Sequence, residues 1–274
     1  MKTRVAAIQL EFAYVSTPQE FTDWVRAPIE RAAAEKAQLI VLPNGLTLAL
    51  LGMFSPDAAP TTTFEQFAAE QHFDSVASFI TDRARWLNEL HAHIFQSLAE
   101  RTETWLMAGT TLQPSDGQVY NTALLFSPEG KIVGRQRQMS ITSKAGTWGF
   151  VPGDEFRLFT TDVANLGILI GEDASNSELA QSLARQGEKV LIHLPAADDT
   201  SDDFRNIVQS NQVFGVQANL VGNAPRFRGR TTIYAPARMT KDGSGILAQA
   251  SSDSSAETVS ATLDFDALGA VADN

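Results

Sequence analysis

Residues 120–137 spell out a β-hairpin: Tyr120-Asn-Thr-Ala-Leu-Leu-Phe-Ser-Pro-Glu-Gly-Lys-Ile-Val-Gly-Arg-Gln-Arg137. Two runs, Asn121–Phe126 and Ile132–Arg135, flank the turn Ser127-Pro-Glu-Gly130. Proline presets a backbone angle suited to a turn, and glycine accepts the positive φ that closes it. The pattern therefore predicts two antiparallel strands at the middle of the chain.

Outward from this hairpin, apolar runs alternate with helical patterns. Residues 84–100 predict an amphipathic helix, because Leu87, Leu90, Ile94 and Leu98 share one face. The run Gln38–Leu42 predicts a buried strand that stops at Pro43, whose nitrogen has no hydrogen to donate. Buried strands that alternate with helices indicate an α/β core, and no linker or repeat divides residues 1–274, so we expect a single domain. The other predicted strands are Val5–Leu10, Trp105–Gly109, Leu166–Ile170, Lys189–Leu194, Ala218–Val221, Thr231–Tyr234, Ile246–Ala250 and Thr258–Leu263, the other helices are Phe21–Lys36 and Glu178–Arg185, and a second turn lies at Asp242–Gly245.

The chain is acidic, with a net charge of −11. Such a surface repels nucleic acid unless a local basic patch intervenes. The one candidate patch is Arg226, Arg228 and Arg230, which also fits a solvated loop paired with nearby acids. No apolar run is long enough for a membrane span. We therefore expect a cytoplasmic protein with neither nucleic acid nor a membrane as partner.

Cysteine is absent from the sequence. This excludes disulfide bonds, thiolate metal sites and a cysteine nucleophile. We predict no cofactor and no metal site.

Several motifs occur in a characteristic order along the chain. They are Val5-Ala-Ala-Ile-Gln-Leu10, Ala37-Gln-Leu-Ile-Val-Leu-Pro43, the hairpin of residues 120–137, Trp148-Gly-Phe-Val-Pro-Gly-Asp154, Leu166-Gly-Ile-Leu-Ile170 with Glu172-Asp173, and Leu183-Ala-Arg-Gln-Gly187. In this order and at these spacings the sequence resembles the nitrilase (carbon–nitrogen hydrolase) superfamily over nearly its whole length. The resemblance implies a four-layer αββα sandwich. It also implies a homodimer, and a regulatory or scaffolding subunit would alternatively associate with an active relative.

The resemblance also indicates where the family's catalytic residues would fall. The general-base Glu corresponds to Asn44, the Lys that holds the oxyanion to Gln138, and the nucleophilic Cys to Gly171. A second Glu of the family corresponds to Ala145. An amide is no base, Gln138 carries no positive charge, and glycine has no side chain to form a covalent intermediate.

The sequence therefore predicts a catalytically inactive, nitrilase-like pseudoenzyme. Such a protein would bind a small polar or amide-like ligand, or serve as a regulatory or scaffolding subunit. Asn44, Gln138 and Glu172 are the predicted ligand contacts. Two states of the pocket stay open at this point: an open cavity that binds a neutral ligand, and a cavity that has closed or filled.

The alternative function is an amidohydrolase that acts on small amides with a non-standard catalytic set. Ser175, His193 and Asp173 would be its nucleophile, base and orienting acid, although Ser175 and Ser177 also suit helix capping. His91 and His93 stand two apart on a helix, so they cannot share a metal ion, and we expect both to be solvent-exposed. Asp198, Asp199, Asp202 and Asp203 read as a solvated acidic loop. The stretch Ser210–Gly215, expected on the next helix, lacks the Arg and Glu common there in the family.

Overall fold

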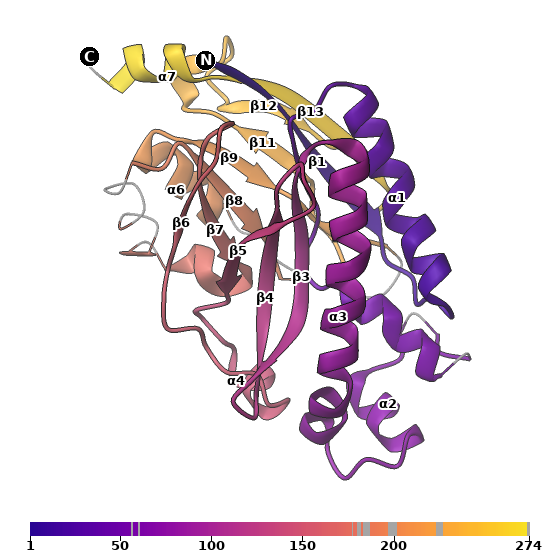
Figure 1. Cartoon of the computed structure of the whole chain (residues 1–274). Helices are drawn as coiled ribbons and strands as arrows, with labels where there is room; N and C mark the ends of the chain where they lie inside the picture. Colours follow the sequence, from indigo (N-terminus) through magenta and orange to yellow (C-terminus); the bar gives the residue numbers. More distant parts are fainter. Residues whose placement is uncertain are drawn as a thin grey trace.

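Two β-sheets lie face to face at the centre of the molecule in a computed structural model (Figure 1). The structure describes residues 1–55, 57–59, 61–176, 178, 179, 182, 187–196, 202–222 and 227–272. The first sheet has the order β10-β1-β2-β3-β4-β5, with β13 also paired to β1, and the second has the order β12-β11-β9-β8-β7-β6. The bounds of the first sheet's strands are β1 (Lys2–Glu11), β2 (Leu39–Val41), β3 (Trp105–Ser115), β4 (Gln118–Phe126), β5 (Ile132–Arg137), β10 (Leu220–Val221) and β13 (Glu257–Asp264). Those of the second are β6 (Leu158–Thr160), β7 (Asn165–Ile170), β8 (Val190–Leu194), β9 (Phe214–Gln217), β11 (Thr232–Tyr234) and β12 (Ile246–Gln249).

Helices cover the outer face of each sheet. On the first sheet lie α1 (Pro18–Ala34) and α3 (Val76–Thr102), with α2 (Phe64–Glu70) beside α3 (Figure 1). On the second lies α6 (Asp203–Asn211), and α7 (Phe265–Ala272) ends the described chain. Short helical segments η1 (Leu46–Phe54), α4 (Ser143–Thr147), η2 (Gly171–Ser175) and η3 (Ala237–Met239) connect these elements. The predicted αββα sandwich is confirmed.

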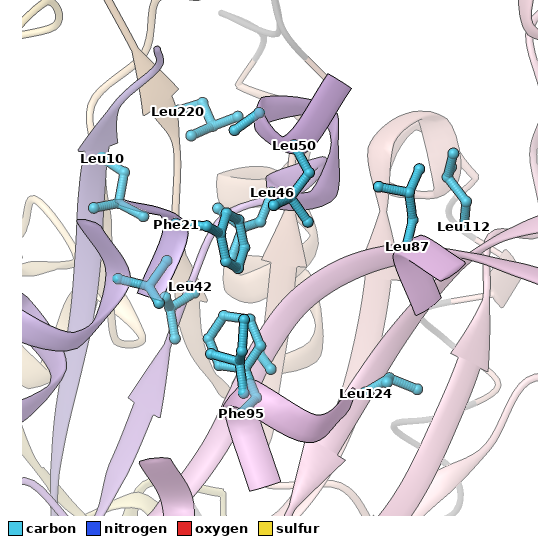
Figure 2. Close-up of a cluster of buried hydrophobic side chains, with 14 of the residues drawn as sticks. Leu10, Phe21, Leu42, Leu46, Leu50, Leu87, Phe95, Leu112, Leu124 and Leu220 are labelled. Atoms are coloured by element: carbon cyan, nitrogen blue, oxygen red, sulfur yellow. The ribbon is translucent and has the colours of Figure 1, made fainter. Parts of the chain in front are cut away.

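Three apolar layers hold the sandwich together. Strand β1 shows why, because its alternate side chains enter different layers: Ile8 packs toward α1 and α3, and Ala7 packs between the sheets. The helix-side layer contains Phe21 and Phe95 (Figure 2). Each fully buried side chain of this kind stabilises the fold by about 1.5–3 kcal/mol. The third layer, which contains Phe204, joins the second sheet to α6.

Helix α3 begins earlier than the sequence predicted. The Ser75 hydroxyl accepts a hydrogen bond from the Ser78 backbone nitrogen, and this cap starts the helix eight residues before the predicted position 84. The apolar face continues upstream through Phe79 and Ile80. At the other end Glu103 adopts a left-handed conformation, which stops the helix. None of the helices in the described residues is both long and apolar enough to cross a bilayer.

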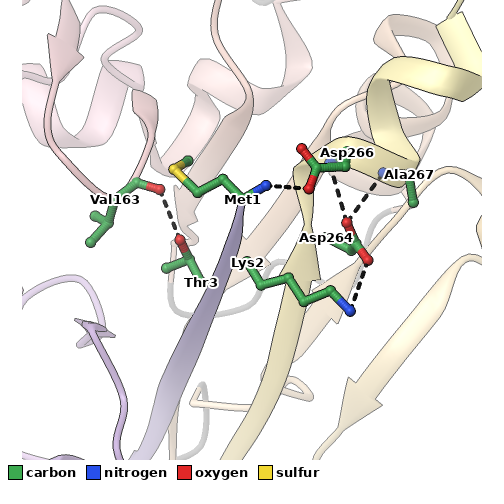
Figure 3. Close-up of polar contacts among 7 residues, drawn as sticks. All are labelled: Met1, Lys2, Thr3, Val163, Asp264, Asp266 and Ala267. Atoms are coloured by element: carbon green, nitrogen blue, oxygen red, sulfur yellow. Dashed lines mark hydrogen bonds and ion pairs between the residues drawn. The ribbon is translucent and has the colours of Figure 1, made fainter.

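The beginning and end of the chain lie side by side (Figure 3). Strands β1 and β13 are antiparallel neighbours, and Lys2 Nζ lies 3.2 Å from a carboxylate oxygen of Asp264. The terminal amino group of Met1 contacts Asp266. The Thr3 hydroxyl donates to the backbone oxygen of Val163, 2.9 Å away, next to the second sheet. These contacts fix the edge at which the two sheets meet.

One region differs from the sequence-based prediction. Only the first two residues of the stretch Ser210–Gly215 are helical, because α6 ends at Asn211 and strand β9 begins at Phe214. Gln212 has a φ of 54°, which ends the helix. The helix after the acidic loop is therefore residues 203–211, and it does carry an arginine, Arg205. The predicted helix Glu178–Arg185 lies largely outside the described residues.

Candidate functional site

Three strand ends bring the predicted site residues together. Asn44 follows β2, Gln138 follows β5, and Gly171 follows β7. The first two strands belong to one sheet and the third to the other, so the site lies where the two sheets face each other. The side chains of Asn44 and Gln138 are linked through Asn121, and a side chain at position 171 would begin next to Gln138.

A chain of hydrogen bonds connects the polar side chains of the site. The Asn44 Oδ1 accepts from the Thr110 hydroxyl at 2.7 Å and from Asn121 Nδ2 at 3.2 Å. Asn121 Nδ2 also donates to Gln138 Oε1 at 2.9 Å, and Gln138 Nε2 donates to the Ser140 backbone oxygen at 2.8 Å. The chain is anchored at its other end by Asn44 Nδ2, which donates to the Pro195 backbone oxygen at 3.2 Å. All four side chains are neutral, and each satisfies its neighbour.

Gly171 sits at a sharp turn between β7 and η2. Its φ is +53°, a left-handed conformation that glycine adopts without steric strain. A Cβ built on Gly171 would lie 2.8 Å from Gln138 Nε2, which is closer than real Cβ atoms approach. The amide of Gln138 therefore occupies the space into which a side chain at position 171 would extend.

Asp173 joins the turn at Gly171 to the segment after Gln138. Its carboxylate accepts from the backbone nitrogens of Met139 at 3.0 Å, Ser140 at 2.7 Å and Ile170 at 3.1 Å. Burial raises the pKa of Asp173 to about 6, and the three N–H donors oppose that rise. The carboxylate joins the ends of β5 and β7 through backbone nitrogens, and the Ser140 side chain also hydrogen-bonds to it. The sequence offered Asp173 only as a possible triad member.

A buried histidine, His91, binds the strand that carries Thr110, the hydrogen-bond partner of Asn44. Strand β3 has a register shift between Met107 and Thr110, and the His91 Nε2 lies 2.8 Å from the backbone oxygen of Ala108 within that irregularity. His91 is fully buried, so the expectation of solvent exposure was wrong for it, whereas His93 is exposed. Thr110, just beyond the bulge, accepts from the Gly45 nitrogen at 2.8 Å while it donates to Asn44. His91 therefore stabilises the strand irregularity that places Thr110 against Asn44.

Other predicted site residues lie elsewhere. Ala145 is in α4, half-buried, with backbone bonds to Thr142, Trp148 and Phe150. The Glu172 side chain is exposed. Neither residue takes part in the hydrogen bonds that link Asn44, Asn121 and Gln138.

The alternative triad has other partners. The Ser175 hydroxyl is exposed and donates to Asp203 at 3.0 Å. His193 is fully buried, with Nε2 3.1 Å from the Gly171 backbone oxygen and its ring against Phe204. The Asp173 carboxylate accepts from backbone nitrogens. Ser175, His193 and Asp173 therefore each have a different hydrogen-bond partner.

The sequence also offered candidates for a metal site and for an arginine patch. Within the described ranges no three His, Asp or Glu side chains are grouped so as to hold a metal ion. Arg228 lies 3.6 Å from Asp253, as expected of a solvated loop paired with acids. Ser177, Asp198, Asp199 and Arg226 lie outside the described residues.

The chemistry available from Asn44, Asn121 and Gln138 is hydrogen bonding between neutral groups. Each side-chain amide nitrogen has two hydrogens, and Asn44 and Gln138 use one each in the bonds described above. Sequence reasoning missed Asn121 as the central link. The signal was present, because asparagine is uncommon inside strands and here lies in β4, shortly before the apolar run Ala123–Phe126.

Comparison with known proteins identifies the family. A carbon-nitrogen hydrolase family model matches residues 4–273. The probable hydrolase YhcX of Bacillus subtilis is 26% identical over 239 residues, which cover 85% of this chain and 43% of YhcX. The chain spans less than two thirds of the length of the first curated relatives that it matches.

Solved structures share the fold. Nit3 of Saccharomyces cerevisiae, a member of branch 10 of the nitrilase superfamily, superposes with a TM-score of 0.74 at 22% identity, covering 99% of this chain and 93% of Nit3. A mutant amidase from Nesterenkonia sp. AN1, showing the result of Michael addition of acrylamide at its active site cysteine, superposes with a TM-score of 0.72 at 18% identity, covering 97% of this chain and 95% of the amidase. Since the family match extends over nearly the whole sequence, this chain belongs to the carbon–nitrogen hydrolase (nitrilase) superfamily.

Proposed function

We propose that this chain is a pseudoenzyme of the superfamily, which binds a small polar or amide-like ligand or a partner protein and does not hydrolyse C–N bonds. One observation carries the proposal: Asn44, Asn121 and Gln138 form a neutral hydrogen-bonded chain beside Gly171. The family resemblance assigns Glu, Lys and Cys to positions 44, 138 and 171. The Nesterenkonia amidase has an active site cysteine, and this chain has no cysteine at all.

The electrostatics of the site agree with this proposal. Removing one member of a buried ion pair costs about 3–5 kcal/mol, because the remaining charge is stranded. Here the positions assigned to the base and the cation are both amides, and their shared neighbour Asn121 donates to both. No charge is stranded between them. Their unused N–H groups suit a neutral ligand with acceptor oxygens, such as a carboxamide.

The Gln138 amide limits the size of any ligand at this point. It fills the space next to Gly171 that the nucleophile's side chain would need. A ligand there would have to displace that amide, or bind on its outer side. Between the two states left open by the sequence, this favours a site that is at least partly filled by its own side chains.

A restoration experiment tests the proposal. We expect the unaltered chain to leave short amides and nitriles intact, and the triple variant Asn44→Glu, Gln138→Lys, Gly171→Cys to release ammonia from them. The matched control is the triple variant with Gly171→Ala in place of Gly171→Cys, which supplies the base and the cation but no nucleophile. Turnover by the unaltered chain contradicts the proposal. A folded triple variant without activity shows that the filled pocket, and not only the missing groups, excludes substrate.

The alternative is an amidohydrolase built on Ser175. The bond from Ser175 to Asp203 and the burial of His193 against Phe204 count against it. If purified protein does hydrolyse an amide, loss of that activity in Ser175→Ala identifies this alternative. Retention in Ser175→Ala directs the search to another nucleophile.

A homodimer, or a complex with an active superfamily member, is part of the proposal. A regulatory or scaffolding subunit in the cytoplasm requires such an association. Light scattering coupled to size-exclusion chromatography of the full chain tests it, and a monomer at all concentrations contradicts the homodimer.

A further inference from the structure

A second hollow lies on the other face of the β4–β5 hairpin from the Asn44–Gln138 site. It is a cleft of about 270 Å³ between α3 and the hairpin. Leu124 of β4 and its cross-strand partner Arg135 of β5 both line it. Successive strand residues face opposite sides of a sheet, so Leu124 faces the helices whereas Asn121 faces the second sheet. The cleft is therefore separate from the site already described.

The hairpin turn contacts helix α3 at Gln96, which lines the cleft. A Cβ added to Gly130, at the hairpin turn, would meet the backbone oxygen of Gln96 at 2.7 Å, so turn and helix touch there. From Gln96 the helical wall continues through Ala92 to Glu89. The volume is slightly below the range of about 300–1,000 Å³ typical of drug-sized ligands, which suits a metabolite the size of an amino acid.

Opposite charges stand on the two walls. Glu89 is on the helix and Arg135 is on the strand, and both side chains are exposed. Among the described residues neither side chain forms an ion pair or a hydrogen bond. The chain has 32 acidic and 21 basic residues, so carboxylates are plentiful, yet none of those in the described part of the chain is paired with Arg135. Ala92, Leu124 and Ile132 form the apolar part of the cleft, and the polar residues Asn88, His93 and Gln96 also line it.

We propose that this cleft binds a small aliphatic α-amino acid. The guanidinium of Arg135 presents a planar fork that can donate two hydrogen bonds to the ligand's carboxylate. The ligand's ammonium group then lies toward Glu89, and its aliphatic side chain covers Leu124 and Ile132. A ligand with a single charge would satisfy one wall only, so the cleft discriminates in favour of a zwitterion.

Calorimetric titration of the full chain with L-leucine tests this. The comparison ligands are 4-methylpentanoate, which lacks the amine, and 3-methylbutylamine, which lacks the carboxylate. We expect leucine to bind at least about tenfold more tightly than either, because each comparison ligand loses one charge-assisted contact. Arg135→Gln and Glu89→Gln should each weaken leucine binding by about tenfold or more.

Two further variants serve as matched controls. Arg85→Gln and Glu103→Gln make the same changes of charge at exposed positions in or next to α3, and neither residue lines the cleft. We expect both to bind leucine like the unaltered chain. Because all four altered side chains are exposed, thermal unfolding should show that every variant remains folded.

Three results would each overturn the proposal. The first is no heat of binding with leucine up to about 10 mM, beyond the weak end of specific affinity. The second is equal loss of binding in the control variants, which would indicate a general charge effect. The third is 4-methylpentanoate binding as tightly as leucine, which would indicate a plain anion site. None of these outcomes bears on the pseudoenzyme proposal, which concerns the opposite face of the hairpin.

Discussion

Replacing Gly171 by alanine tests whether Gln138 really fills the space beside the turn. The new methyl group would lie 2.8 Å from Gln138 Nε2, so the amide must move. Movement breaks the bonds that Gln138 makes with Asn121 and with the Ser140 backbone. Two such bonds contribute about 1–3 kcal/mol in total to the free energy of unfolding.

The backbone adds a second cost. At a φ of +53° an alanine suffers a clash that glycine avoids, and this costs about 1–2 kcal/mol. Gly171→Ala should therefore destabilise the chain by about 2–5 kcal/mol, as measured by urea unfolding.

Gly117→Ala is the matched control. Gly117 has a φ of +76° and no atom within 4 Å of its would-be Cβ, so only the backbone cost applies. We expect the difference between the two variants to be about 1–3 kcal/mol, the value of the Gln138 bonds. The double variant Gly171→Ala, Gln138→Ala should show strong non-additivity, because the amide that clashes is gone. If Gly171→Ala costs no more than Gly117→Ala, the Gln138 amide moves without loss and the reasoning about a filled pocket fails.

Three further predictions follow from buried polar groups. Burial lowers the pKa of His91 to about 4. Below about pH 6.5 the unfolded chain therefore binds more protons than the folded chain, and the free energy of unfolding falls as the pH drops from 6.5 toward 4. In His91→Gln, which can keep a donor toward Ala108, the free energy of unfolding in urea should depend less steeply on pH between pH 7 and 5. Glu188 is 2% exposed, neither of its carboxyl oxygens has a hydrogen-bond partner within the described chain, and burial raises its pKa to about 8. In the unfolded chain this carboxyl loses its proton near pH 4.3, so the free energy of unfolding falls as the pH rises from there to 8. The variant Glu188→Gln should therefore be more stable than the unaltered chain at pH 8 but not at pH 4. Asn44→Glu and Gln138→Lys should each destabilise the chain when made alone. A double-mutant cycle should give a favourable coupling free energy of about 1 kcal/mol or more between the two new charges. Additive effects on the free energy of unfolding would mean that the two side chains do not interact.

Local patterns were enough to predict most of the strands. The hairpin of residues 120–137 forms as expected, with Gly130 at a φ of +71° in its turn. Turn chemistry and alternation act over a few residues, so a sequence displays them directly. The stretch Ser210–Gly215 was expected on a helix, but α6 ends at Asn211 and β9 begins at Phe214, because Gln212 adopts a left-handed conformation without being glycine.

The site was harder to predict from residues alone. Its three corners come from strands in two sheets, and only the family resemblance indicated that Asn44, Gln138 and Gly171 would meet. His91 was misjudged although the signal was visible: it follows Leu87 by four residues and precedes Ile94 by three, which places it on the apolar face of α3. The role of Asp173 as a link between backbone segments depends on tertiary contacts that no local pattern encodes.

The neutral site also constrains how this protein can differ from an active relative. A half-buried carboxylate or ammonium at position 44 or 138 is stabilised by an opposite charge close by, and both positions lie within hydrogen-bond distance of Asn121. Changing one position to an amide would leave the other charge buried without a partner, at a cost that is a large fraction of a typical domain's stability. If the chain is the pseudoenzyme proposed above, the two amides are therefore one coupled replacement. Gly171 belongs to the same proposed change, because the Gln138 amide takes the space that a side chain there would need. The space beside Gly171 is therefore filled by a neutral amide, whereas the buried carboxylate at the turn, Asp173, is held by the backbone nitrogens of Met139, Ser140 and Ile170.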